Sequence, residues 1–151
     1  MEHLSTERID VLSLWQQCHH PEAGGIVLFS GEVRNNHQGK AVSHLYYEAA
    51  EPMANKLIGA LLEEAKQRWG LQVAMAIHRL GEVPVMETAV VVITAAAHRK
   101  EAYTANQYII DRIKHHIPIW KCECFADGER VWGGHCSCPH ENIDERKPKA
   151  E

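Results

Sequence analysis

Two lysines lie seven residues apart in the segment DRIKHHIPIWKCE, residues 111–123, and a proline separates them. Lys114 ends an apolar-periodic stretch, where the dipole of a helix C-terminus would also explain a lysine. Lys121 follows in an alternating stretch that places it on the same face of a strand as Glu123. A partly desolvated lysine near other cations has a lowered pKa, which suits it to proton transfer or to activating an acyl group. The pair is therefore a candidate for catalysis.

A second basic group opens the helix predicted over about residues 97–115 and consists of His98, Arg99 and Lys100. The N-terminus of a helix is already positive, so cations there are unfavourable unless an anion binds to them and to the backbone N–H groups. The alternative is a solvated basic turn, and the segment taken by itself favours this alternative. Arg34 ends the first apolar strand, where its guanidinium could bind a phosphate or carboxylate, or form an ordinary surface ion pair.

The five cysteines lie in a chain without an export signal, so thiols or a metal site are expected rather than disulfides. If the last two predicted strands pair, thiols and imidazoles could hold zinc as a structural clip. The C-x-C spacing is unusual for zinc, and the second pair lies close to the charged C-terminus, so we expect no metal. The alternative zinc cluster would comprise Cys122, Cys124, His135, Cys136, Cys138 and His140.

Length and composition indicate one globular domain with a real core, because the chain has 151 residues and 45% hydrophobic residues. A formal net charge of −4 argues against nucleic-acid binding through bulk charge. No apolar run approaches the roughly 20 residues that cross a bilayer, so we expect no membrane insertion. The N-terminus lacks a basic region followed by an apolar one, so we expect a cytoplasmic protein.

Apolar periodicity predicts two main helices that would position these groups. The first spans residues 52–69, with a proline in its first turn, and ends at Gly70. The second spans about 97–115 and cannot continue through Pro118. A further short helix near the N-terminus would be capped by Ser5 or Thr6. The inward-facing residues are predicted to be Met53, Leu57, Leu61, Ala65 and Trp69 in the first helix, and Ala102, Ala105, Ile109 and Ile113 in the second.

Strands are predicted between and after these helices. The β-branched run at 88–94 is typical of a central strand. The polar, turn-rich residues 35–43 predict a mobile loop, and Gly81 with Pro84 predicts a turn. The remaining strands are predicted in residues 25–34, 44–48, 71–79, 118–125 and 129–134.

The mixed order of strands and helices, without a regular βαβ alternation, predicts the α+β class. We assign residues 1–140 to a single domain and 141–151 to a charged, frayed C-terminal tail. In this arrangement the two lysines would lie on either side of the junction between the second helix and the strand that follows it.

Four motifs occur in order along the chain: FSGEVRNNHQG, IHRLGEVPVMETAVVV, AHRKEAY, and the two-lysine segment ending in PIWKCE. In order and spacing they resemble the large catalytic subunits of molybdopterin synthase, the MoaE family. The resemblance extends over roughly residues 20–135. Each motif alone is weak, but the linked set is specific. The resemblance implies a fold of the α/β-hammerhead type, with a mixed sheet and two main helices.

The resemblance also implies an activity, that of a sulfurtransferase in molybdenum cofactor biosynthesis. Such enzymes convert cyclic pyranopterin monophosphate to molybdopterin by inserting the two dithiolene sulfurs. The sulfur arrives as the thiocarboxylate of a C-terminal Gly-Gly on a small ubiquitin-like partner. Two large subunits form a homodimer and, with two partners, a heterotetramer. No cofactor is implied. The alternative is a non-catalytic phosphate-binding module or a zinc-clip interaction module.

Site residues follow from the same resemblance. It implies that Lys114 and Lys121 are catalytic, beside the thiocarboxylate tail, where they would neutralise negative charge and move protons. It implies that Arg34 comes from the neighbouring subunit. Met86 departs from the family pattern, because glycine is common at that turn. The full substrate-binding set implied is Arg34, His98, Arg99, Lys114, Lys121, Cys122 and Glu123.

Overall fold

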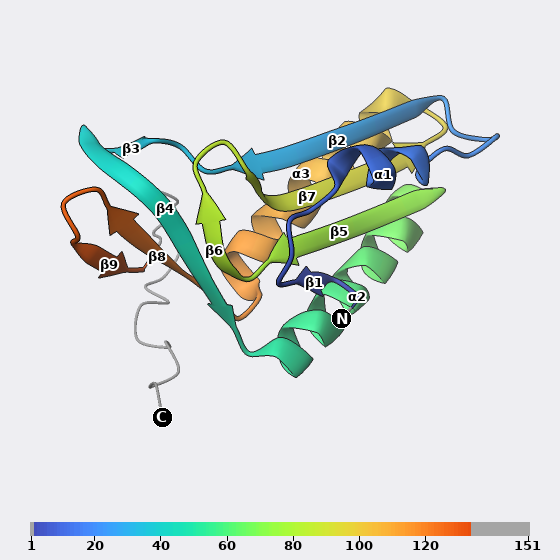
Figure 1. Ribbon diagram of the computed structural model, residues 1–151. Helices are drawn as coiled ribbons and strands as arrows, with labels where there is room; N and C mark the ends of the chain where they lie inside the picture. Colours follow the sequence, from blue (N-terminus) through green and yellow to red (C-terminus); the bar gives the residue numbers. More distant parts are fainter. Residues whose placement is uncertain (1, 134–151) are drawn as a thin grey trace.

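The computed structural model describes residues 2–133, and Figure 1 shows how their elements are arranged. The predicted tail 141–151 lies outside the described residues, as do His135, Cys136, Cys138 and His140. The helices within residues 2–133 are α1 (Val11–Gln16), α2 (Glu51–Trp69) and α3 (Arg99–His116). The strands are β1 (Leu4–Ser5), β2 (Gly25–Glu32), β3 (Asn36–His37), β4 (Lys40–Ala49), β5 (Val73–Arg79), β6 (Gly81–Pro84), β7 (Thr88–Ala96), β8 (Ile119–Phe125) and β9 (Arg130–Trp132).

The first sheet has the strand order β1-β5-β7-β2, with β7 in its interior. Strand β7 pairs antiparallel with both β2 and β5, which is why its continuous β-branched run is buried on both faces. Helices α2 and α3 cover one face of this sheet, and α1 lies over the other (Figure 1). The prediction of a central strand at 88–94 is confirmed.

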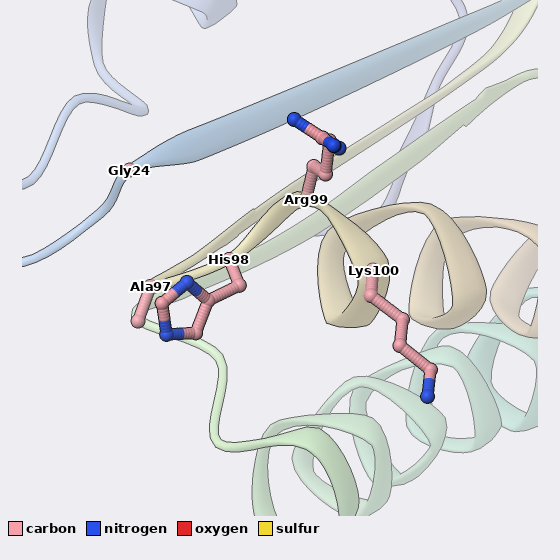
Figure 2. A pocket seen from close by; sticks show the side chains of 5 residues that line it. All are labelled: Gly24, Ala97, His98, Arg99 and Lys100. Atoms are coloured by element: carbon pink, nitrogen blue, oxygen red, sulfur yellow. The ribbon is translucent and has the colours of Figure 1, made fainter.

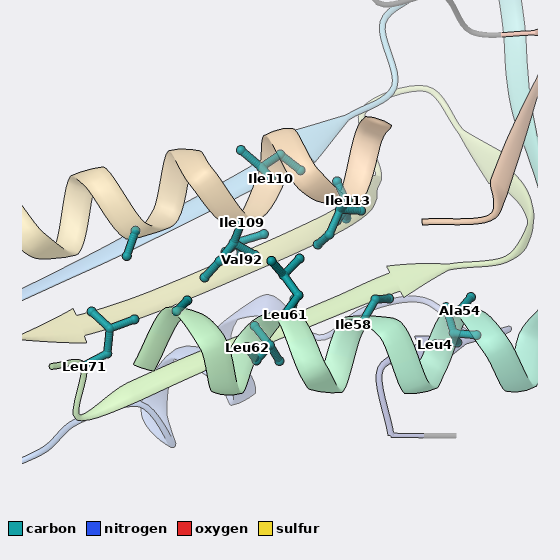
Figure 3. Close-up of a cluster of buried hydrophobic side chains, with 14 of the residues drawn as sticks. Leu4, Ala54, Ile58, Leu61, Leu62, Leu71, Val92, Ile109, Ile110 and Ile113 are labelled. Atoms are coloured by element: carbon teal, nitrogen blue, oxygen red, sulfur yellow. The ribbon is translucent and has the colours of Figure 1, made fainter. Parts of the chain in front are cut away.

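The main core lies between the first sheet and the two long helices (Figure 3). Helix α3 buries the four residues predicted for it. Helix α2 buries Leu61 and Ala65 as predicted, but the prediction is wrong for the first turns of the helix, since Met53 is 59% exposed and Leu57 is 38% exposed. A stripe that repeats every four residues winds around a helix with 3.6 residues per turn, so it cannot stay on one face over five turns. The buried residues of α2 are Ala54, Ile58, Leu61, Leu62 and Ala65.

The second sheet carries β3, β4, β8 and β9 in that order, with β6 also paired to β4. It contains the segment 35–43, and the prediction of a mobile loop there is wrong. Strands β3 and β4 form a hairpin whose two turn residues, Gln38 and Gly39, both have positive φ, at 50° and 79°. Such a turn matches the twist of paired strands. Lys40 anchors the hairpin through ion pairs with Asp127 at 3.2 Å and with Glu129.

Local predictions at two other places are also corrected. Helix α1 is capped by Asp10, whose carboxylate accepts a hydrogen bond from the N–H of Ser13 at 3.1 Å. Ser5, the predicted cap, instead lies in β1 and pairs with Arg79 of β5. Residues 81–84 form strand β6 rather than only a turn, because β4 is long enough to pair with β6 and β8 on its two edges.

The α+β class is confirmed, with two sheets rather than one mixed sheet. Both long helices begin and end within two residues of the predicted positions, and Gly70 ends α2 in the left-handed conformation. Met86 also has a positive φ of 72°, which explains why glycine suits this turn. Among residues 2–133, no helix has both the length and the hydropathy needed to cross a membrane.

Two neighbouring residues of α2 test which face of the helix forms the core. We expect Ile58→Ala to lower the free energy of unfolding by about 2–5 kcal/mol, because the side chain is fully buried. Leu57→Ala removes a similar side chain from a partly exposed position and should cost less than about 1 kcal/mol. Urea denaturation of both variants measures the difference. Equal losses would contradict the assigned face.

Candidate functional site

The candidate residues form two groups at opposite ends of α3. His98 and Arg99 lie at its N-terminus, and Lys114 lies in its last turn. At 1.5 Å per residue, the helix separates Arg99 from Lys114 by roughly 22 Å. One chain therefore does not bring the two groups into a single hollow. A site that uses both would need residues from a second copy.

A surface hollow lies at the N-terminus of α3, lined by Gly24, Ala97, His98, Arg99 and Lys100 (Figure 2). A Cβ at Gly24 would lie 2.4 Å from the carbonyl oxygen of Ala97, so glycine allows β2 to start close to this turn. Figure 2 shows that Arg99 and Lys100 point away from each other. An anion here would therefore be bound by the N–H groups of the helix terminus, with His98 and Arg99 at its sides.

The second group is built around Glu123, whose side chain is only 8% exposed. One carboxylate oxygen lies 3.4 Å from Nζ of Lys121 on the same strand. The other lies 3.6 Å from Nε2 of His37 in the β3–β4 hairpin. The predicted side-by-side placement of Lys121 and Glu123 on one face of β8 is seen here. A buried carboxylate needs such partners, because leaving it unpaired would be strongly unfavourable.

A half-buried ring and a buried ring contact each other near Lys121. Tyr47 of β4 lies directly opposite Lys121 of β8 in the sheet register. Its ring makes an edge contact with the imidazole of His78, with 4.7 Å between ring centroids. Burial, with a further contribution from Glu123, raises the pKa of Tyr47 to about 12. The sequence indicated neither ring as a site residue, because their contact joins β4 to β5.

His78 is buried, and its Nδ1 lies 2.7 Å from the carbonyl oxygen of Arg79. Burial is the main reason why the pKa of His78 is lowered to about 4; the hydrogen bond to Arg79 opposes this effect, and the positive charge of Lys114 adds to it. His78 and Tyr47 therefore form a ring pair that is uncharged at neutral pH.

Arg34 and Cys122 complete the predicted set. Arg34 is exposed and lies between β2 and the hairpin that carries His37. Cys122 is fully buried on the face of β8 opposite to Lys121. Its Sγ lies 3.9 Å from Sγ of Cys124. Burial raises the pKa of the Cys122 thiol. Cys122 thus lies on the opposite face of β8 from Lys121 and Glu123 and does not contribute to the group around Glu123.

Within residues 2–133, no three His, Cys, Asp or Glu side chains are placed to share a metal ion. Four residues of the alternative zinc cluster lie outside this range: His135, Cys136, Cys138 and His140.

The fold and the two basic groups define an α+β domain with cationic side chains at both ends of one helix. The family model described as MoaE protein matches residues 4–116, and the chain belongs to this family. It is 40% identical over 129 residues to the molybdopterin synthase catalytic subunit of Thermoplasma volcanium, covering 85% of this chain and 94% of that protein. It is 40% identical over 126 residues to the same subunit from Staphylococcus carnosus, covering 83% of each chain.

The structure is similar to the crystal structure of molybdopterin synthase from Staphylococcus aureus. The TM-score is 0.82 at 34% sequence identity, and the match covers 89% of this chain and 97% of that chain. The resemblance inferred from the four motifs is thus confirmed at the level of family and fold.

Burial of His78 should make stability depend on pH. Above the ordinary pKa of 6.5 the residue is neutral in both folded and unfolded chains. As the pH falls from 6.5 toward 4, the unfolded chain binds a proton that the folded chain does not, so the folded state loses up to about 3 kcal/mol. We expect His78→Gln to lose less stability over this interval than the wild type. Denaturant titrations at pH 7 and pH 4.5 measure this, and identical pH dependence would contradict it.

Proposed function

We propose that this chain is the catalytic subunit of a molybdopterin synthase, a sulfur-transferring enzyme of molybdenum cofactor biosynthesis. It converts cyclic pyranopterin monophosphate to molybdopterin by inserting two sulfurs. Each sulfur is delivered as the C-terminal thiocarboxylate of a small ubiquitin-like partner. Membership of the MoaE family and the names of its relatives support this activity. The cytoplasmic location stays a prediction from the sequence.

The observation that carries the proposal is the placement of Lys121. Its ammonium is held 3.4 Å from the buried carboxylate of Glu123, and the half-buried Tyr47 is its partner on the neighbouring strand. A lysine held in this way is preorganised to meet a second anion, because its side chain is already ordered. The thiocarboxylate of the partner is such an anion. Lys114, in the last turn of α3, is the second ammonium that we assign to the reaction.

The sulfur transfer requires both stabilisation of negative charge and transfer of protons. When the thiocarboxylate sulfur attacks a side-chain carbon of the pterin that carries the cyclic phosphate, the bond between that carbon and the phosphate oxygen breaks, and the oxygen takes the electron pair. The product is a thioester between the partner and the substrate, with the phosphate ring opened. Water then cleaves the bond between the acyl carbon and sulfur, so the sulfur stays on the pterin and the partner leaves as a carboxylate. Negative charge develops on oxygen in the second step, and nearby ammonium groups stabilise it. Lys114 and Lys121 are assigned this work.

The substrate phosphate is assigned to His98 and Arg99 at the N-terminus of α3. The roughly 22 Å between Arg99 and Lys114 means that the two copies of a homodimer would each supply part of one site. The resemblance to the family likewise implies that Arg34 reaches the site from the neighbouring subunit. With two small partners, the dimer would form a heterotetramer.

Replacing Lys121 tests the activity. We expect Lys121→Ala to lower molybdopterin formation by about 100-fold or more, because the variant loses the ammonium held beside Glu123 that stabilises the developing negative charge. Lys66→Ala, which removes an ammonium paired with Glu63 on the surface of α2, should not change the rate. The assay mixes the chain with thiocarboxylated partner and cyclic pyranopterin monophosphate and measures molybdopterin. Near-normal turnover of Lys121→Ala, with its fold intact, would refute the role.

Mixing two inactive variants tests whether a site is shared between copies. If Lys121 and Arg99 of one site come from different copies, a mixed dimer of Lys121→Ala and Arg99→Ala has one intact site. Random exchange of subunits would then restore about a quarter of wild-type activity. If both residues come from one copy, no activity returns. The same experiment with Arg34→Ala in place of Arg99→Ala tests whether Arg34 and Lys121 of one site come from different copies.

A further inference from the structure

The imidazole of His37 lies beside the buried carboxylate of Glu123, and the function proposed above gives it no role. Its Nε2 lies 3.6 Å from one carboxylate oxygen, Oε2, while Nζ of Lys121 lies 3.4 Å from the other oxygen, Oε1. The Glu123 side chain is 8% exposed and the imidazole is 39% exposed. The carboxylate is therefore placed between an ammonium and a ring that is charged only when it is protonated.

The β3–β4 hairpin holds His37 in this position. His37 pairs with Lys40 across the hairpin, next to its two-residue turn. The Lys40 ammonium lies 3.2 Å from the carboxylate of Asp127 and also pairs with Glu129, both in the turn between β8 and β9. Lys40 thus ties the hairpin to the strand pair that carries Glu123, so one sheet sets the distance between the imidazole and the carboxylate.

The charged groups around His37 leave Glu123 as its acidic partner. Lys40, opposite His37 in the hairpin, is already paired with two carboxylates of the β8–β9 turn. Arg34 precedes the hairpin and is exposed. From β8, Lys121 approaches the far oxygen of the carboxylate that His37 approaches. The imidazole and the Lys121 ammonium therefore share one negative charge when the ring is protonated.

The net charge of this group depends on the proton of His37. With a neutral imidazole, the charges of Lys121 and Glu123 cancel. With a protonated imidazole, two positive charges face one negative charge, and the group has a net positive charge. Tyr47 adds no charge, because burial and the nearby Glu123 raise its pKa to about 12. Only the protonated state gives the group a net attraction for an incoming anion.

A similar contact elsewhere in the second sheet shows what is particular about this one. Nδ1 of His44 lies 3.7 Å from Glu82, but that carboxylate is 64% exposed, so water and salt screen the pair. The carboxylate of Glu123 is buried, and charges beside it are screened much less. Of these two histidines, His37 is thus the one whose proton affects a buried ion pair.

We propose that His37 is a positioning residue for Lys121: its imidazolium neutralises Oε2 of Glu123, so that the Lys121 ammonium beside Oε1 stays directed toward a C-terminal carboxylate or thiocarboxylate. The inference rests on the proposed function, because the anion is the C-terminus of the small partner. It gives the β3–β4 hairpin a part in accepting that tail. Binding of the tail is then strongest when the imidazole is protonated.

Charge variants at His37 test this role. The partner, with an unmodified C-terminal carboxylate, is titrated calorimetrically into the wild type, His37→Gln and His37→Lys at pH 6 and pH 8.5. At pH 6 we expect His37→Gln to bind roughly fivefold more weakly than the wild type, and His37→Lys to bind like the wild type. At pH 8.5 the wild type should bind as weakly as His37→Gln, and His37→Lys roughly fivefold more tightly than both. Equal affinities of the wild type and His37→Gln at pH 6 would overturn the proposal.

Two controls separate contact with the tail from a structural effect. His44→Gln removes the comparable imidazole and should bind the partner as the wild type does at both pH values. A partner that lacks its two terminal glycines should bind the wild type and His37→Gln equally, because its shortened tail does not reach Lys121. A roughly fivefold loss in His44→Gln, or a loss of that size with the truncated partner, would show a structural role and overturn the proposal.

A double-mutant cycle shows whether His37 acts through Glu123. In the Glu123→Gln background the carboxylate is absent, so His37→Gln should weaken binding less than about twofold at pH 6. The same roughly fivefold loss in both backgrounds would overturn the proposal. Molybdopterin formation by the wild type with thiocarboxylated partner tests the proposed function separately. No product would refute that function, whereas normal formation with unchanged binding by His37→Gln would refute only the role of His37.

Discussion

The fixed position of α3 on the first sheet determines the geometry of both basic groups. Asn106, buried in the middle of the helix, donates through Nδ2 to the carbonyl oxygens of Val27 and Val92, both at 3.0 Å. Thr94 donates to the carbonyl oxygen of Ala102 at 2.7 Å. These buried hydrogen bonds oppose any sliding of α3 along β7, because each would be left unsatisfied. The helix therefore sets the separation between the groups at its two ends.

The dipole of α3 makes those two ends chemically different. Its positive N-terminus, flanked by His98 and Arg99, concentrates positive charge that an anion can neutralise. Its C-terminus is negative, so Lys114 is favoured there without any ligand. The end of α3 that carries His98 and Arg99 is thus stabilised only when an anion binds. The end that carries Lys114 is stable without a ligand. This difference agrees with a site in which a mobile phosphorylated substrate meets preorganised ammonium groups.

Elements with strong local signals could be predicted from the sequence. The β-branched run of β7, the inward face of α3 and the shared face of Lys121 and Glu123 all follow from periodicity. Two errors arose where tertiary contacts override local pattern. The polar segment 35–43 is ordered because Lys40 is anchored by the β8–β9 turn, which its own composition does not indicate. The buried face of α2 depends on which side of the helix meets the sheet.

The site residues that sequence reasoning missed share one property. His37, Tyr47 and His78 make their contacts across strands that are far apart in the sequence. Register between such strands is set by the whole sheet, so no local spacing reveals it. His78 lies within the motif IHRLGEVPVMETAVVV, but the motif does not indicate which residues contact its side chain.

The different surroundings of the two lysines bear on what each can do. Lys121 and Glu123 form an ion pair in which the carboxylate is mostly buried, so removing either would leave the other poorly compensated. Lys114 has no such dependence, because it is exposed to solvent in the last turn of α3 and forms no ion pair with the carboxylates of residues 2–133. An ammonium that is not paired with a carboxylate can take part in proton transfer without disrupting a buried charge pair. Two identical side chains, seven residues apart, can therefore supply fixed charge and proton transfer to the same reaction.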